Sequence, residues 1–219
     1  MSAGPQILAS GPWTREQVTY TWSQEPYEAA DADTAAADAK IQELKDRDSP
    51  SHDGVSTRMA AHRVDEHGAL HLELEPVRWA LRLLPGGAAR SMTGQCVVLD
   101  HEGRWLAGRR ADWVATWAGR WSLGAGGAVD PGESPMTTLE RELDEEWAVA
   151  PERLEGLSLV LLPSELVMFV GVAWLAPGAE VTRDPEHDAH EWWPADVDAW
   201  PDYADLPLRS LARAVQDLT

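Results

Sequence analysis

The sequence predicts an α/β protein of 219 residues, with an accessory region of helix and strands over residues 1–90 and the main domain over residues 91–219. Two observations in the main domain support this. The run VMFVGVAWL, inside Glu165–Leu175, is nearly all apolar, as a buried strand should be. Asp205–Leu218 repeats apolar residues at helical spacing. The hydrophobic fraction of 44% is enough to form a core around such elements.

The accessory region reads as one helix followed by a pair of strands. Tyr27–Arg47 is rich in Ala and Asp and predicts a surface helix, and the residues DRDSPSHDG at 46–54 predict a loop. Ser56–Arg63 and Ala69–Glu75 predict strands around the turn DEHG, because leucines alternate with polar residues in the second of them. A short helix is expected at Glu75–Leu84.

The main domain begins with a hairpin and ends with the apolar strands, an acidic loop and a terminal helix. A long loop through two tryptophans separates the hairpin from a central helix. The predicted elements are, in order, strands Gln95–Asp100 and Arg104–Arg109, a helix at Ser134–Trp147, strands Leu157–Pro163 and Glu165–Leu175, a loop at Asp184–His190 and a helix at Asp205–Leu218.

The central segment GAVDPGESPMTTLERELDEEWAV, Gly127–Val149, carries the chemistry. Glu142, Glu145 and Glu146 stand at i, i+3 and i+4 and share one face of a helix. Carboxylates crowded in this way repel one another unless a cation neutralises them. Their hard oxygen ligands suit Mg²⁺ or Mn²⁺, ions that also take up phosphate oxygens.

The same segment carries the signals that would form this helix. Ser134 is a good N-cap and Pro135 suits the first helical position. Met136, Leu139 and Leu143 form an apolar stripe that can dock on a sheet. Loop, turn and helix are therefore expected in one continuous piece, with the carboxylates away from the docking face.

This spacing resembles the Nudix box, G-x5-E-x7-R-E-U-x-E-E-x-G-U with U an aliphatic residue. The resemblance implies the Nudix fold, an α/β/α sandwich with a mixed sheet, and a metal-dependent hydrolase of diphosphates linked to another group. It implies Mg²⁺ (or Mn²⁺) as the cofactor, held by Glu142, Glu145, Glu146 and the carbonyl of Gly127. It also implies an ion pair between the residues that match the box arginine and the first box glutamate, Arg141 and Glu133.

Ala148 is the one position that departs from the box, where the family has glycine. Glycine there ends the helix in a left-handed conformation, which costs alanine roughly 1 kcal/mol. We expect a local change at the helix end and no loss of activity, and the path of the chain after Trp147 is the part this departure puts in question.

The general base has candidates in two places. The resemblance implies either a box glutamate, Glu142 or Glu145, or a glutamate from a loop near the C-terminus. Glu186 begins a pattern resembling E-H-x-x-x-x-W that is often found there, whereas the alternative is an ordinary acidic loop residue. His187 and His190 are expected at the surface.

Substrate contacts are expected from the residues that precede the box. Arg109 and Arg120 have guanidinium groups that match phosphate geometry, as does Arg110 beside the first of them. Trp117 could stack on a base, whereas Trp121 is expected in the core. The alternative for each arginine is a solvated surface position.

Composition excludes several classes of partner. The net charge of −19 argues against nucleic acid and anionic membranes. Cys96, the single cysteine, is expected to be a buried thiol. No signal peptide or transmembrane run is evident, so we expect a cytoplasmic enzyme with a small-molecule partner, and the family resemblance adds a possible homodimer.

The accessory region loosely resembles the leading region of Nudix hydrolases that act on nucleoside diphosphate sugars. That resemblance implies an enzyme that converts a nucleotide sugar to a nucleoside monophosphate and a sugar phosphate. Two alternatives stay open: a nucleoside triphosphate pyrophosphohydrolase, and a ligand-sensing module without catalysis. The second usually loses box carboxylates, which this chain keeps.

Overall fold

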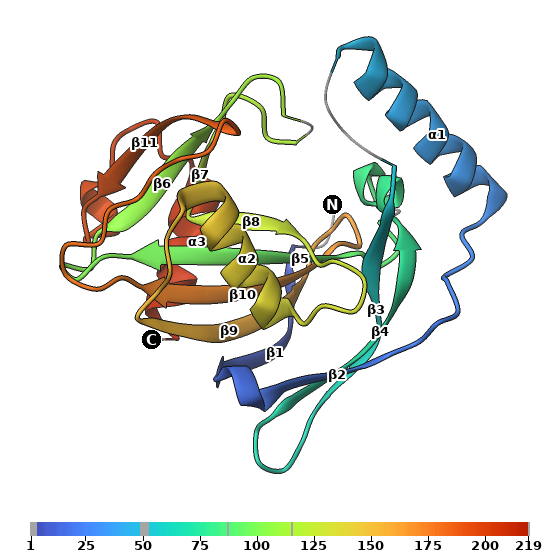
Figure 1. Ribbon diagram of the computed structural model, residues 1–219, viewed down its shortest axis with the longest axis horizontal. Helices are drawn as coiled ribbons and strands as arrows, with labels where there is room; N and C mark the ends of the chain where they lie inside the picture. The colour runs from blue at the N-terminus through green and yellow to red at the C-terminus, as the bar shows by residue number, and fades with distance from the viewer. Residues whose placement is uncertain (1–3, 49–52, 87, 115, 219) are drawn as a thin grey trace.

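A large sheet with helices on both faces and a smaller sheet at its side make up the protein (Figure 1). The computed structural model describes residues 4–48, 53–86, 88–114 and 116–218. Part of the loop expected at 46–54, residues 49–52, lies outside this described range.

The described residues form eleven strands, three α-helices and three short 3-10 helices. The large sheet contains β1 (Gln6–Trp13), β5 (Met92–Leu99), β6 (Trp105–Arg110), β7 (Trp121–Leu123), β8 (Ala125–Ala128), β9 (Arg153–Leu161), β10 (Val167–Trp174) and β11 (His187–Trp193). The small sheet contains β2 (Val18–Trp22), β3 (Val55–Val64) and β4 (Leu70–Arg78). The helices are α1 (Asp31–Asp46), α2 (Pro135–Trp147), α3 (Leu206–Gln216), η1 (Arg15–Gln17), η2 (Trp79–Leu83) and η3 (Val197–Ala199).

The large sheet is mixed, and its strands run in the order β1-β9-β10-β5-β6-β11. β10 and β5 are parallel, from the pair Val167 and Met92 to the pair Trp174 and Leu99, while the other pairings are antiparallel. β5 and β6 pair only where Leu99 meets Trp105, and then β5 pairs with β8 and β6 with β7. This divergence brings the glycine-rich start of the box segment into the middle of the sheet.

Each face of the large sheet is covered by one helix, which confirms the α/β/α sandwich (Figure 1). α2 buries Met136, Leu139 and Leu143 in one core, as their stripe predicts. α3 buries Leu208 in the core on the opposite face. Each such side chain contributes roughly 1.5–3 kcal/mol when fully buried.

The N-terminal region forms its own small core but is also joined to the main domain. α1 packs on η2 through Ile41 and Leu44 against Leu81. β1 is an edge strand of the large sheet and pairs with β9. In the small sheet, the N–H of Thr57 donates to the carbonyl of Val129 at 3.2 Å. The division of the chain near residue 90 stays a prediction.

Three predicted elements differ from the structure. The helix expected from Tyr27 begins only at Asp31, after the extended N-cap Ala30. Instead of a helix from Glu75, β4 continues to Arg78 because it pairs with β3, and a single 3-10 turn follows. The acidic loop expected at Asp184–His190 is wrong from residue 187 onward, where β11 pairs with β6.

Two expectations about single features can be compared with the structure. Cys96 is fully buried in the core, as expected, and burial raises the pKa of its thiol. Within the described residues, no helix is long and apolar enough to cross a membrane.

The end of α2 keeps its left-handed turn although glycine is missing there. Ala148 adopts φ 51° and ψ 42°. Its N–H donates to the carbonyl of Asp144 at 2.9 Å, and the N–H of Val149 donates to Leu143 at 3.3 Å. The chain after Trp147 therefore leaves the helix in the left-handed conformation that glycine would favour, and the alanine bears the conformational cost.

Ala148→Gly should stabilise the protein, because glycine adopts this conformation without steric cost. We expect a gain of about 1 kcal/mol and a rise in Tm of about 2–4 °C for a chain of this size. Thermal unfolding by circular dichroism measures it. Ala150→Gly is the matched control, since Ala150 is exposed and outside the set of positive-φ residues; equal effects of the two changes would contradict the strain at Ala148.

Candidate active site

The box helix starts where local sequence signals place it. The Oγ of Ser134 accepts a hydrogen bond from the N–H of Thr137 at 3.1 Å, and Pro135 occupies the first turn. From this start, helical spacing brings Glu142 and Glu146 to the side that meets β8, and both are buried. The carboxylate face predicted from the spacing is therefore partly enclosed by the sheet.

Gly127 lets the box strand lie directly against Glu142. A Cβ atom at this position would stand 1.9 Å from Oε1 of Glu142, so any other residue would displace that carboxylate. The carbonyl of Gly127, which the family resemblance implied as a metal ligand, accepts a hydrogen bond from Oγ1 of Thr93 at 2.6 Å. Gly127 thus lies beside the Glu142 carboxylate, while its carbonyl is bonded to Thr93 of β5.

Arg141 ties the loop before α2 to the carboxylates on the helix. Its Nε donates to Oε1 of Glu133 at 3.2 Å, so the structure contains the implied ion pair. Its Nη2 donates to the carbonyl of Ala128 at 3.0 Å. Its Nη1 donates to Glu142 at 2.7 Å and to Glu145 at 3.0 Å. One guanidinium group thus fixes the loop and partly neutralises two glutamates.

Glu146 is slightly more buried than Glu142 and lies near the end of β6 and the start of β11. Nη1 of Arg110 lies 3.8 Å from Oε1 of Glu146 and 2.9 Å from Oε2 of Glu186. Nε2 of His187 lies 3.9 Å from Oε2 of Glu146, and its Nδ1 lies 3.3 Å from Asp184. Glu186, from the C-terminal part of the chain, is thereby brought to the box through Arg110.

Burial disfavours the charged forms of the two inner carboxylates. Desolvation raises the pKa of Glu142 to about 7, against the opposing charge of Arg141. Desolvation also raises the pKa of Glu146 well above its usual range, and the nearby Glu142 adds to the shift. Two neighbouring carboxylates that ionise reluctantly are a common feature of functional sites.

The donor set fits a hard divalent cation. Glu142, Glu145 and Glu146 offer carboxylate oxygens from one helix face, with the backbone of Gly127 beside the first of them. As they stand in the described part of the chain, no three acidic, histidine or cysteine side chains converge closely enough to hold an ion. Nη1 of Arg141 lies between Glu142 and Glu145, and 57% of the Glu145 side chain is exposed.

The other predicted substrate residues lie on or beside the β6–β7 loop and are engaged elsewhere. Nη1 of Arg109 donates to Asp188 at 2.8 Å, and Arg120 pairs with Asp205. The guanidinium of Arg120 also lies 4.5 Å from the centroid of the Trp117 ring, which is exposed. Their role in binding substrate stays a prediction.

Trp121 differs in part from its expected core position, since it is half-buried and stacks on Tyr203 at 5.3 Å between ring centroids. It nevertheless packs against the core beneath α3.

Arg110 and His187 are the residues that sequence reasoning under-used. Side chains alternate along a strand, so only one of Arg109 and Arg110 could face the box, and the sequence did not show which. The surface position expected for His187 is wrong, because its ring packs on Trp147 at 4.7 Å between centroids and is buried beside Gly108. His190 is exposed, as expected.

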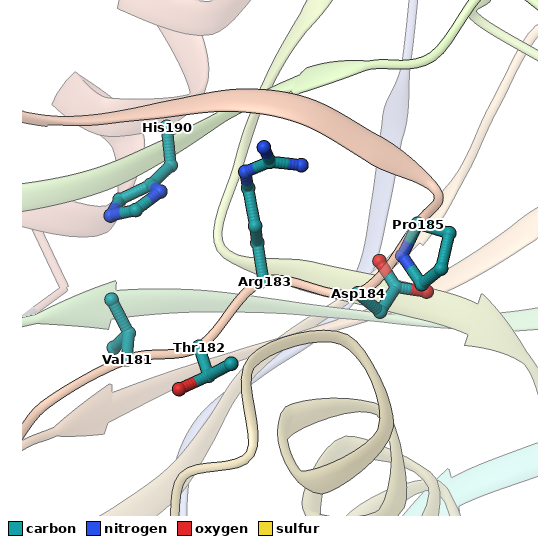
Figure 2. Close-up of a pocket in the computed structure, with 6 residues that line it drawn as sticks. All are labelled: Val181, Thr182, Arg183, Asp184, Pro185 and His190. Carbon is teal, nitrogen blue, oxygen red and sulfur yellow. The ribbon is translucent and has the colours of Figure 1, made fainter.

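A shallow hollow of about 460 Å³ lies beside the end of α2 (Figure 2). Figure 2 shows Arg183 between His190 and Pro185, with Val181 and Thr182 below His190 in this view. The N–H of Asp184 donates to the carbonyl of Glu146 at 2.9 Å, so this loop borders the box helix. The hollow is thus next to the carboxylates without containing them.

Comparison with protein families identifies a domain that includes the box segment Gly127–Val149. The family model of the NUDIX domain matches residues 92–213. No curated protein is significantly similar to the chain.

Several solved structures resemble part of the chain. The MutT protein from Methanosarcina mazei is 23% identical, over 58% of this chain and 94% of that chain, with a TM-score of 0.45. The NUDIX domain of Shewanella oneidensis NrtR, complexed with ADP ribose, is 26% identical over 59% and 88%, with a TM-score of 0.45. A C. elegans Ap4A hydrolase is 20% identical over 58% and 96%, also with a TM-score of 0.45. These TM-scores are low, so the family assignment rests on the sequence match alone.

The raised pKa of Glu142 predicts that stability in EDTA falls as pH increases. The stabilisation from its neutral form is fully present below its ordinary pKa of 4.5 and is lost as pH rises through about 7. At roughly 1.4 kcal/mol per pKa unit, the loss is at most about 3 kcal/mol. Urea unfolding at pH 5 and pH 8 measures it.

Glu142→Gln is the control that isolates this effect, because the acidic chain also repels itself more as pH rises. The variant should lose less stability than the wild type between the two pH values. An identical loss in both proteins would show that Glu142 titrates in its ordinary range.

Proposed function

We propose that the substrate of this protein is a nucleotide sugar. The chain belongs to the Nudix family and is a Nudix pyrophosphohydrolase, and the proposal starts from that assignment. The reaction is hydrolysis of the pyrophosphate bond: water adds to one phosphorus, the bridging P–O bond breaks, and the products are a nucleoside monophosphate and a sugar phosphate. UDP-glucose-like and ADP-ribose-like compounds are the first candidates.

The observation that carries the proposal is the set of contacts around Arg141. Glu133, Glu142 and Glu145 are all held by this one side chain, so the box is present as an assembled unit. A sensing module without catalysis would not need these carboxylates, which argues for an enzyme. Buried Glu142 and Glu146 would hold Mg²⁺ or Mn²⁺ together with Glu145.

The accessory region favours a nucleotide sugar over a nucleoside triphosphate. Its small sheet is hydrogen-bonded to the box loop, where Oγ1 of Thr57 donates to the carbonyl of Asp130 at 2.9 Å. A region in this position can enclose the part of the substrate beyond the diphosphate. Triphosphate cleansing enzymes tend to be little more than the core, so that activity remains the second candidate.

Two groups of residues act in the proposed reaction, the box on one side of the site and Glu186 with Arg110 on the other. A bound divalent cation would supply charge stabilisation for the phosphate oxygens. Glu186 accepts the proton of the attacking water, and Arg110 holds the carboxylate of Glu186 in place at 2.9 Å. Arg141 keeps the loop before α2 bound to the helix while the charges at the site change during the reaction. Arg109, Arg120 and Trp117 remain proposed contacts to the substrate, and a cytoplasmic homodimer is the proposed setting.

The test is a substrate panel with the purified protein and Mg²⁺. UDP-sugars, ADP-ribose, dinucleoside polyphosphates and nucleoside triphosphates are incubated separately, and products are identified by mass. We expect a nucleoside monophosphate and a sugar phosphate, formed only without EDTA. Pyrophosphate released from triphosphates would favour the second candidate, and turnover that survives EDTA would contradict the metal requirement.

Glu145→Gln should abolish turnover and leave the fold intact. It removes one ligand charge, and the side chain is largely exposed, so we expect a loss of roughly 100-fold or more without a lower Tm. Steady-state kinetics on the substrate found in the panel measures it. Asp144→Asn is the matched control, because Asp144 is exposed on the same helix; near-normal activity of the Glu145 variant would contradict its role.

Glu186→Gln tests the general base. If Glu186 takes the proton from water, the amide cannot, and kcat should fall by more than about tenfold with little change in KM. Glu180→Gln, in the segment before β11, is the control, because Glu180 is exposed and has no role in the proposed site. An unchanged kcat would remove Glu186 from the mechanism and leave a box glutamate as the base.

A further inference from the structure

Arg82 stands in the accessory region, and the charge of Glu142 in the box acts on its guanidinium. It belongs to η2, which packs between α1 and β3. Its neighbours Ala80 and Leu81 are buried in the small core, so the backbone that carries Arg82 is fixed. The side chain itself is half-buried.

Arg82 forms no ion pair and donates no hydrogen bond among the described residues. Two arginines of the same region are paired: Arg58 with Glu75, and Arg78 with Asp38 and Asp53. A guanidinium group has five N–H donors, and leaving them unpaired in a partly buried position costs free energy.

The charge that acts on Arg82 belongs to the box. Desolvation lowers the pKa of its guanidinium to about 10, and the opposing influence comes from Glu142. The one aromatic ring nearby, that of Trp79, lies 5.8 Å away between the guanidinium carbon and the ring centroid. Glu142 is therefore close enough for its charge to act on Arg82, although no hydrogen bond or ion pair joins the two side chains in the described part of the chain.

Backbone connections explain how an accessory residue reaches this site. Arg78, at the end of β4, pairs with Val55 of β3, and η2 follows at once. The next residues of β3, Ser56 and Thr57, are hydrogen-bonded to the carbonyl of Val129 in the box loop. The segment that carries Arg82 is thus tied to the box loop through β3 and β4.

We propose that Arg82 is a substrate-binding residue, whose guanidinium donates hydrogen bonds to the diphosphate oxygens of the substrate beside Glu142. The inference rests on the proposed function, because it supplies the anion that Arg82 lacks. Guanidinium and phosphate fit one another through two parallel hydrogen bonds, and a desolvated arginine gains most from such a partner. The accessory region then contributes directly to recognition of the diphosphate.

A binding role and a structural role of Arg82 lead to different expected changes in Tm. An arginine that stabilises the fold lowers Tm when it is replaced, whereas an unpaired, partly buried cation is itself a cost. Arg82→Met keeps the length of the aliphatic stem and removes the charge. It should therefore weaken binding of the diphosphate without lowering Tm.

The experiment measures binding of inorganic pyrophosphate in Mg²⁺ by isothermal titration calorimetry. We expect Kd to rise at least about tenfold in Arg82→Met, and by less in Arg82→Lys, which keeps the charge but loses the planar fork. Arg63→Met is the matched control, because Arg63 is exposed on β3 and the substitution removes the same charge. The Kd of this variant for pyrophosphate should stay within about twofold of the wild-type value. Tm is measured for each variant.

Pyrophosphate binding that is unchanged in Arg82→Met, or a loss equally large in Arg63→Met, would overturn the proposal, as would wild-type protein that binds no pyrophosphate. A lower Tm with unchanged Kd would assign Arg82 to the fold. Failure of the nucleotide-sugar proposal is a separate result: wild-type protein that hydrolyses none of those substrates, yet binds pyrophosphate in an Arg82-dependent manner, refutes the substrate and supports this inference.

Discussion

Repulsion among the box carboxylates is the constraint around which the rest of the site is arranged. Glu142 and Glu146 are buried on one helix face; Arg141 of the same helix lies 2.7 Å from the first, and Arg110 of β6 lies 3.8 Å from the second. Arg141 serves the first and also bonds the loop backbone at Ala128. The same contact that moderates charge therefore closes the loop, so local electrostatics and local shape are not independent.

The sheet provides the space that this arrangement needs. Because β5 and β6 share only the pair Leu99 and Trp105, β7 and β8 can insert between their diverging ends. β8 carries Gly127, whose missing side chain leaves room for Glu142. On the opposite face α3 covers a separate core. The helices on both faces of the sheet therefore support β8, whose small side chains alone would provide little packing.

Sequence reasoning succeeded where a signal is local and failed where it depends on distant pairing. Capping by Ser134 and the apolar stripe of α2 are read within one segment, and both are found. β11 has no such signal: residues 184–190 look like an acidic loop, and from His187 onward they form a strand only by pairing with β6. β1 likewise depends on β9, over a hundred residues later. Arg110 could not be separated from Arg109 without knowing the orientation of the strand.

β1 has a consequence for how the sheet ends. It covers one side of β9, whose backbone N–H and C=O groups would otherwise form an open edge beside the segment that matches the family model. Open edges invite pairing with other molecules and aggregation. β1 itself is irregular, with register shifts between Ile7 and Ala9 and between Ser10 and Trp13. The first strand of the chain thus ends the sheet with a surface that is poorly suited to add another strand, and so guards the protein against self-association through that edge.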